Sequence, residues 1–188
     1  MDTCALFPVY LCDTLLRLAE EQAFRPLWSD DVLTELERNL HKRGLDAVAA
    51  SRRIQGMRDY FPDAEVHGYQ QLIPTMTCDP KDRHVLAAAV RSNVEVLVTF
   101  NLKDFPREAL DQYEIEAVHP DEFLLDQLDL YPGRTLAALR HQISDYARPP
   151  TTLSQLASAL CKAGVPRFAA EIARHPDVRP DFEDHGSS

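Results

Sequence analysis

The sequence of 188 residues has few of the patterns that build disulfide scaffolds or zinc sites. Its four cysteines are scattered without a CxxC pair, and its seven histidines show neither HxxxH nor HxH spacing. Zinc sites require such closely spaced ligands, and disulfide frameworks require paired cysteines in an oxidising compartment. We therefore expect neither, and we interpret the cysteines as small buried hydrophobic residues in a reducing compartment.

Long apolar segments are also absent. The longest apolar run, residues 4–12, contains Pro8 and is far shorter than the roughly 20 residues that cross a bilayer. No basic and apolar signal segment opens the sequence. These absences predict a cytoplasmic protein without a membrane partner.

The composition is that of an ordinary globular domain, with 45% hydrophobic and 27% charged residues. The formal net charge of −10 is uneven, because residues 1–130 carry −11 and residues 131–188 carry +1. An acidic chain is poorly suited to coat nucleic acid nonspecifically. A metal-dependent nuclease remains compatible with this charge, since its site must itself be acidic.

The hydrophobic pattern alternates helices with short strands. Strands are expected at residues 64–69, 94–99 and 115–118. Helices are expected at residues 13–24, 29–43, 46–60 and 79–92, and later at 121–130, 135–147, 153–164 and 166–174. Alternation of this kind predicts an α/β domain with a mostly parallel sheet over residues 1–130. We expect a helical extension over residues 131–175 and a flexible tail over residues 176–188.

Four acidic residues fall near strand ends and helix starts, where parallel sheets place their functional sites. They are Asp2, Glu35, Asp82 and Asp104. Converging carboxylates repel one another, and a divalent cation relieves that repulsion. A bound cation also generates hydroxide and stabilises charge on a phosphate, so such a cluster suits phosphoester hydrolysis.

Each acid also has a plain structural interpretation. Asp79 is placed to cap a helix that has Pro80 at its first position, and Asp82 then falls in the first turn, where an acid stabilises the helix dipole. Glu35 is compatible with a solvated helix position, and Asp104 with a turn. Only the joint placement of the acids favours a functional site.

Four segments that contain these acids resemble, in order, the motifs of PIN-domain ribonucleases. They are Asp2 to Pro8 (DTCALFP), Trp28 to Leu36 (WSDDVLTEL), Cys78 to Ala89 (CDPKDRHVLAAA) and Val96 to Pro106 (VLVTFNLKDFP). The resemblance covers about residues 1–125. It implies a three-layer α/β/α sandwich with a five-stranded parallel sheet.

The resemblance also implies a function. Asp2, Glu35, Asp82 and Asp104 would hold Mg²⁺ or Mn²⁺ and catalyse the cleavage of single-stranded RNA. The expected supporting residues around them are Thr3, Asp79, Thr99 and Asn101. Bacterial chains of this kind are commonly VapC-like toxins, each neutralised by an antitoxin protein, and some form homodimers.

The sequence departs from the family at its first strand. Family members have several apolar residues before the first aspartate, whereas only Met1 precedes Asp2 here. Without a central strand, the neighbouring strands would lose hydrogen-bond partners. We therefore expect the first strand of the nuclease domain to be largely missing.

Residues 36–58 contain six basic residues against two acids. One interpretation is a row of RNA-phosphate contacts beside the acidic site. The other is an ordinary solvated helical hairpin. The candidate RNA-binding residues are Arg38, Lys42, Arg43, Arg52 and Arg53.

Two other functions fit an acidic α/β domain. A phosphoryl-transfer or phospho-acceptor domain also gathers aspartates at strand ends, but it needs a complete first strand and a suitably placed lysine. Lys103 is near a strand end without a recognisable spacing. A catalytically silent interaction module is the third possibility, and metal-dependent RNA cleavage separates the three.

Overall fold

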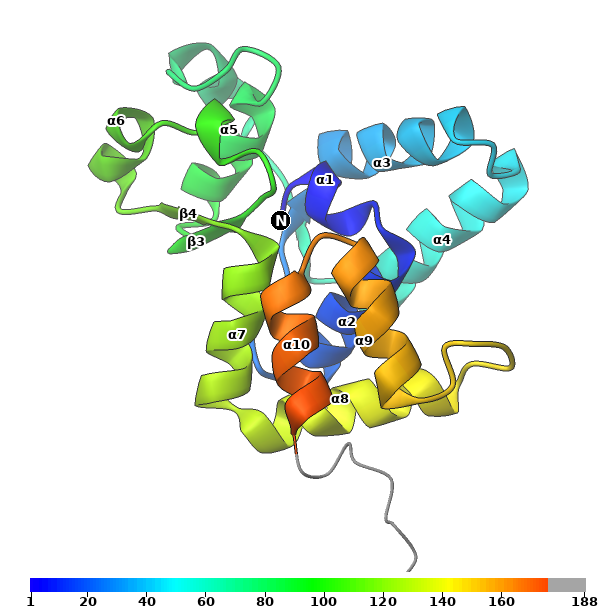
Figure 1. Cartoon of the computed structure of the whole chain (residues 1–188). Helices are drawn as coiled ribbons and strands as arrows, with labels where there is room; N and C mark the ends of the chain where they lie inside the picture. The colour runs from blue at the N-terminus through cyan, green and yellow to red at the C-terminus, as the bar shows by residue number, and fades with distance from the viewer. Residues whose placement is uncertain (176–188) are drawn as a thin grey trace, which may run out of the picture.

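The computed structural model describes residues 1–175, which form ten α-helices and four short strands (Figure 1). The strands are β1 (Trp28–Ser29), β2 (Glu65–Val66), β3 (Val96–Val98) and β4 (Glu116–Val118). The helices of the first half are α1 (Thr3–Leu6), α2 (Val9–Glu20), α3 (Asp30–Lys42), α4 (Ala47–Tyr60) and α5 (Arg83–Arg91). Those of the second half are α6 (Arg107–Leu110), α7 (Pro120–Leu130), α8 (Pro132–Ser144), α9 (Leu153–Lys162) and α10 (Pro166–Arg174). Three 3₁₀ turns complete the described chain: η1 (Gln70–Thr75), η2 (Leu102–Asp104) and η3 (Asp111–Tyr113).

The strands form two parallel pairs, β1 with β2 and β3 with β4. Met1 and Asp2 lie between the pairs. The Met1 ammonium donates to the Leu27 carbonyl at 2.7 Å, and the Asp2 amide donates to the Val98 carbonyl at 3.1 Å. Two residues therefore stand at the place where the resemblance implies the central strand, and Figure 1 shows the N-terminus at the middle of the molecule.

A cavity of about 430 Å³ continues from Met1 between the facing edges of β1 and β3. Val96 lines it and is 40% exposed, although it belongs to a strand inside the fold. Trp28 Nε1 and Gln127 Oε1, on two residues that also line the cavity, are buried without hydrogen-bond partners among the described residues. The sheet is therefore incompletely paired beside its first two residues.

The alternation of side chains along β3 divides the interior into two cores. Leu97 packs into a core built around α3, α4 and α5, whereas Val98 packs into a second core built around α2 and α7 to α10. Successive strand residues point to opposite faces, so the strands lie between two helical layers. The α/β class with parallel strands and added C-terminal helices is as predicted.

The C-terminal helices are joined to the strand-containing part by a buried carboxylate. Asp121, in the first turn of α7, accepts hydrogen bonds from the Phe168 amide at 2.8 Å and the Arg167 amide at 3.0 Å. These amides are free donors at the start of α10, where a negative charge is favourable. The second core runs across residue 131, so the division placed there from sequence stays a prediction. The predicted tail at 176–188 lies outside the described residues.

Some predicted boundaries were correct and others were wrong. The helix predicted over residues 29–43 is α3, and Ser29 caps it by accepting from the Val32 amide. The helix predicted from residue 79 instead begins at Arg83, because the Asp79 side chain accepts from the Lys81 amide and closes a separate turn. The helix predicted from residue 13 begins at Val9, directly after Pro8. No helix in residues 1–175 is long and apolar enough to span a bilayer.

Adding about five apolar, β-branched residues before Met1 is expected to raise the free energy of unfolding. The new strand would pair with both edges of the cavity, and each buried backbone group that gains a partner is worth about 1–3 kcal/mol. The extension would also remove a buried ammonium whose pKa is lowered to about 6 by desolvation. Urea denaturation of both proteins measures the effect, with a Gly/Ser extension of equal length as the control. Equal midpoints and equal slopes for all three would refute it.

Candidate active site

The carboxylate of Asp2 is held at the end of β3. Its Oδ2 accepts hydrogen bonds from Thr99 Oγ1 at 2.7 Å and from Cys4 Sγ at 2.9 Å. Thr99 Oγ1 in turn accepts from the Asn101 amide at 3.0 Å. Asp2 is only 3% exposed, so this network fixes a buried carboxylate in one orientation.

Glu35 reaches the same region from α3. Thr3 Oγ1 donates to its Oε2 at 3.1 Å, which ties α3 to the start of α1. His84 Nε2 lies 3.8 Å from the same oxygen, too far for a hydrogen bond, and Arg38 lies 3.9 Å from Oε1. Glu35 is partly exposed, and it therefore keeps oxygen lone pairs for a ligand.

Asp82 and Asp104 come from two loops that are joined by their backbones. The Asp79 amide donates to the Asp104 carbonyl at 3.0 Å. The Asp82 side chain makes no capping hydrogen bond to α5, and its buried Oδ2 has no hydrogen-bond partner among the described residues. Lys81 Nζ lies 3.0 Å from Asp104 Oδ2 and 3.8 Å from Asp82 Oδ2.

The electrostatics of Asp82 show a shortage of positive charge. Burial raises the pKa of its carboxyl from 3.8 to about 6, the charge of Asp2 raises this pKa further, and the Lys81 ammonium opposes the shift. Desolvation and like charges both disfavour an ionised acid. A cation placed at Asp82 would therefore be bound favourably.

One cavity of about 510 Å³ connects these groups. Three of the four predicted acids line it: Asp2, Glu35 and Asp82. Asp104 is linked to its wall through the ion pair with Lys81. Thr3 and Asn101 also line the cavity, whereas Thr99 and Asp79 support it through their contacts with Asp2, Lys81 and the Asp104 backbone.

The donor set fits a hard divalent cation. Carboxylate oxygens are the ligands that Mg²⁺ prefers, and Mg²⁺ usually keeps several waters and few protein ligands. Asp82 Oδ2, which has no hydrogen bond within residues 1–175, and the Lys81 ammonium between Asp82 and Asp104 both mark a place for positive charge. In residues 1–175 no three or more His, Cys, Asp or Glu residues already stand in metal-binding geometry. The acids therefore fit a cation that uses one or two of them directly and others through water.

The candidate RNA-binding residues are divided by the structure. Lys42 and Arg43, at the end of α3, line the acidic cavity. Arg53 instead donates to the carbonyls of Leu6 and Phe7, and Arg52 lines a separate hollow on α4.

Sequence reasoning missed two members of the site. Cys4 donates to Asp2 and accepts from the Phe100 amide, and Lys81 binds Asp104. Lys103, the lysine that the sequence places near a strand end, makes no ion pair within residues 1–175. The available signal was that Lys81 directly precedes Asp82 in an otherwise acidic loop.

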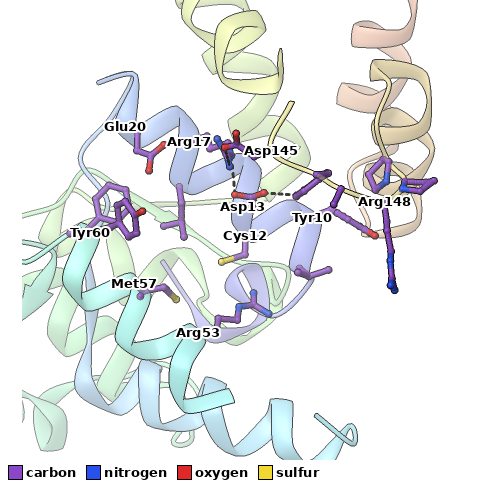
Figure 2. Close-up of a pocket in the computed structure, with 18 residues that line it drawn as sticks. Tyr10, Cys12, Asp13, Arg17, Glu20, Arg53, Met57, Tyr60, Asp145 and Arg148 are labelled. Atoms are coloured by element: carbon purple, nitrogen blue, oxygen red, sulfur yellow. Dashed lines mark hydrogen bonds and ion pairs between the residues drawn. The ribbon is translucent and has the colours of Figure 1, made fainter. Parts of the chain in front are cut away.

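A larger cavity, of about 940 Å³, lies between α2, α4 and residues 145–150 (Figure 2). Two of its three acids, Asp13 and Asp145, are already paired with neighbours, and the third, Glu20, is exposed to solvent. Arg17 binds both Asp13 and Asp145, and the Tyr146 hydroxyl donates to Asp13. With those acids neutralised in this way, the cavity lacks the charge excess found at Asp82 and is not a candidate cation site.

The PIN domain model matches residues 1–103, which is more than half of the chain, and contains three of the four acids. This chain belongs to the PIN domain family. A second model, the VapC50 C-terminal domain, matches residues 120–174, the helices of the second core. The family thus agrees with the resemblance drawn from the four motifs.

A relative in Mycobacterium tuberculosis (strain ATCC 25618 / H37Rv), named "Putative ribonuclease VapC50", is 53% identical over 107 residues. That alignment covers 57% of this chain and 63% of the relative, so the chain spans less than two thirds of that protein's length. The search of solved structures found no match.

Replacing Asp82 with Asn is expected to stabilise the cation-free protein in a pH-dependent way. Because the folded-state pKa of Asp82 is raised, the aspartate costs nothing below about pH 4, and stability is lost as the pH rises through about 6. Asn stays neutral throughout. The melting temperature of Asp82→Asn minus that of the unchanged protein should therefore grow from about pH 4 to about pH 7 in chelator.

The exposed Asp126 on α7 provides a matched control, since Asp126→Asn should show no such trend. A difference for Asp82→Asn that is constant across the pH range would contradict the electrostatic account of the site.

Proposed function

We propose that this protein is a metal-dependent endoribonuclease that cleaves single-stranded RNA, using Asp2, Glu35, Asp82 and Asp104. The observation that carries the proposal is that acids from three separate segments line one cavity, in which a buried carboxylate oxygen has no hydrogen-bond partner. Membership of the PIN domain family and likeness to a relative named as a ribonuclease support it.

The chain's own residues have distinct roles in this reaction. Asp2, oriented by Thr99 and Cys4, would hold Mg²⁺ or Mn²⁺ together with Glu35, Asp82 and Asp104, some of them directly and others through water. When bound, the metal ion supplies an acidified water and charge stabilisation for the phosphate. Thr3 orients Glu35, and Asn101 orients Thr99 through its backbone amide.

We further propose that the protein is the toxin of a type II toxin–antitoxin module, because its relative carries the name VapC50 and its C-terminal helices match the VapC50 C-terminal domain. The partner would be a cognate antitoxin with a segment that covers the acidic cavity. A homodimer and a cytoplasmic location belong to the same proposal.

Replacing Asp104 with Asn is expected to reduce the rate of cleavage of a single-stranded RNA oligonucleotide by at least about a hundredfold. The substitution keeps the shape of the side chain and removes a charged oxygen. Excess chelator should have the same effect on the unchanged protein. Circular dichroism would check that the fold is retained. Asp111→Asn, at an exposed acid of η3, is the control and should cleave normally.

Full cleavage in chelator, or by Asp104→Asn, would refute the proposal. Phosphorylation of an aspartate by a small phosphodonor without RNA cleavage would favour a phospho-acceptor domain. Neither activity, with no metal binding, would favour a silent interaction module.

The double variant Lys42→Ala/Arg43→Ala is expected to raise the KM for single-stranded RNA and to leave the metal affinity nearly unchanged. Each lost phosphate contact should reduce the slope of log affinity against log salt by about 0.7. Arg52→Ala, which alters the separate hollow on α4, is the matched control. An equal effect of Arg52→Ala, or an unchanged slope in the double variant, would contradict the assignment.

A further inference from the structure

Lys81 places one fixed positive charge among buried acids. Its Nζ lies 3.0 Å from Asp104 Oδ2 and 3.8 Å from Asp82 Oδ2. The side chains of Asp104 and Asp82 are only 8% and 11% exposed, whereas that of Lys81 is 62% exposed. The ammonium therefore enters the acid cluster from the solvent side and partly neutralises carboxylates that are largely shielded from solvent.

The backbone of Lys81 is held by a hydrogen bond to Asp79, whereas its side chain is held by its ammonium. Its amide donates to Asp79 Oδ1 at 3.1 Å, and the Asp79 amide donates to the Asp104 carbonyl at 3.0 Å. The contacts of the ammonium within residues 1–175 are the ion pairs with Asp104 and Asp82. A flexible four-carbon chain with an exposed stem can swing away without disturbing the turn that carries it.

We propose that Lys81 is a tethered counter-ion of the site, which competes with a divalent cation for Asp104 and must be displaced from that carboxylate when the cation binds. The inference rests on the proposed function, because it takes the acid cluster to be the metal site. It goes beyond that function by assigning a control on metal affinity to a residue outside the four acids.

The competition follows from distance and charge. An oxygen that already accepts a hydrogen bond from an ammonium at 3.0 Å has less electron density for a metal ion. A divalent cation and an ammonium placed on the same carboxylate also repel one another, and that repulsion is strong where water is excluded. Lys81 thus stabilises the cation-free acids and raises the metal concentration needed to load the site.

An ordinary surface ion pair does not explain the contact. Exposed pairs contribute little because water screens both partners. Here the acid partners are buried, and a single ammonium lies 3.0 Å from Asp104 Oδ2 and 3.8 Å from Asp82 Oδ2. Lys103, one residue before Asp104 in the chain, makes no ion pair in the described part of the protein and so provides a matched control.

Calorimetric titration of Mn²⁺ into the full chain at about pH 8 tests the proposal. Lys81→Met should lower the Kd for Mn²⁺ on the order of three- to tenfold, because the competing charge is gone. Lys81→Arg keeps the charge and should stay close to the unchanged protein. Lys103→Met should stay within about twofold, since a screened charge without contact to the acids acts weakly.

Thermal melting separates this role from a merely structural one. Without metal, Lys81→Met should melt below the unchanged protein, and Mn²⁺ should then raise its melting temperature by more than it raises that of the unchanged protein. A structural lysine would lower both melting temperatures equally and leave the Kd alone. Lys81→Gln serves the same comparison if the Met variant does not fold.

The outcomes distinguish this inference from the proposed function. If the unchanged protein binds Mn²⁺ and cleaves RNA while Lys81→Met and Lys81→Gln bind Mn²⁺ with equal or weaker affinity, only the role of Lys81 is overturned. If the unchanged protein does not bind Mn²⁺, the proposed metal site and the role of Lys81 are both overturned. Tighter binding by Lys81→Met with no change in Lys103→Met supports the inference.

Discussion

The hydrogen bonds of the first two residues join the two strand pairs on which the rest of the structure is built. The Met1 ammonium binds the carbonyl before β1, and the Asp2 amide binds the last carbonyl of β3. These two contacts bridge strand pairs that otherwise do not touch each other through a backbone ladder. The carboxylate of the same residue, Asp2, accepts a hydrogen bond from Thr99. One residue therefore both links to β3 through its backbone and contributes its side chain to the acidic site.

The site itself is an arrangement of unfavourable charges that the fold holds in place. Asp2 and Asp82 are both buried, and the charge of Asp2 makes ionisation of Asp82 costlier. The free-energy cost of holding these acids together is offset by the packing of the two hydrophobic cores on either side of β3. Packing of the cores thereby holds the carboxylates close enough together for one cation to bind them.

Sequence patterns predicted the local features well, because those depend on neighbours along the chain. The helix predicted over residues 29–43 is confirmed as α3, and Ser29 caps it by accepting from the Val32 amide. The start of α5 was predicted wrongly, because the Asp79 side chain can either cap a helix or close a turn, and Lys81 lies within reach of the turn. Four acids in the family's order pointed to one cluster, and three of them line one cavity.

Features that depend on distant contacts were not predictable. The pairing of Asp121 with the start of α10 spans 46 residues, so no pattern of neighbouring residues predicts it. The ion pair of Lys81 with Asp104 depends on the two loops meeting across the Asp79 amide. The role of Arg53 in binding the carbonyls of α1 likewise appears only once α4 packs beside α1, which is why its basic charge alone suggested RNA.

The central claim is that Asp2, Glu35, Asp82 and Asp104, at the cavity of about 510 Å³, form a divalent-cation site. The most direct test is a crystal of the protein soaked in Mn²⁺, with an anomalous difference map recorded from the manganese signal. The account predicts a peak within coordination distance of Asp82 and Asp2, with Lys81 turned away from Asp104. A peak only at the Arg17 cavity of Figure 2, or an ordered acid cluster without a peak at saturating Mn²⁺, would contradict it.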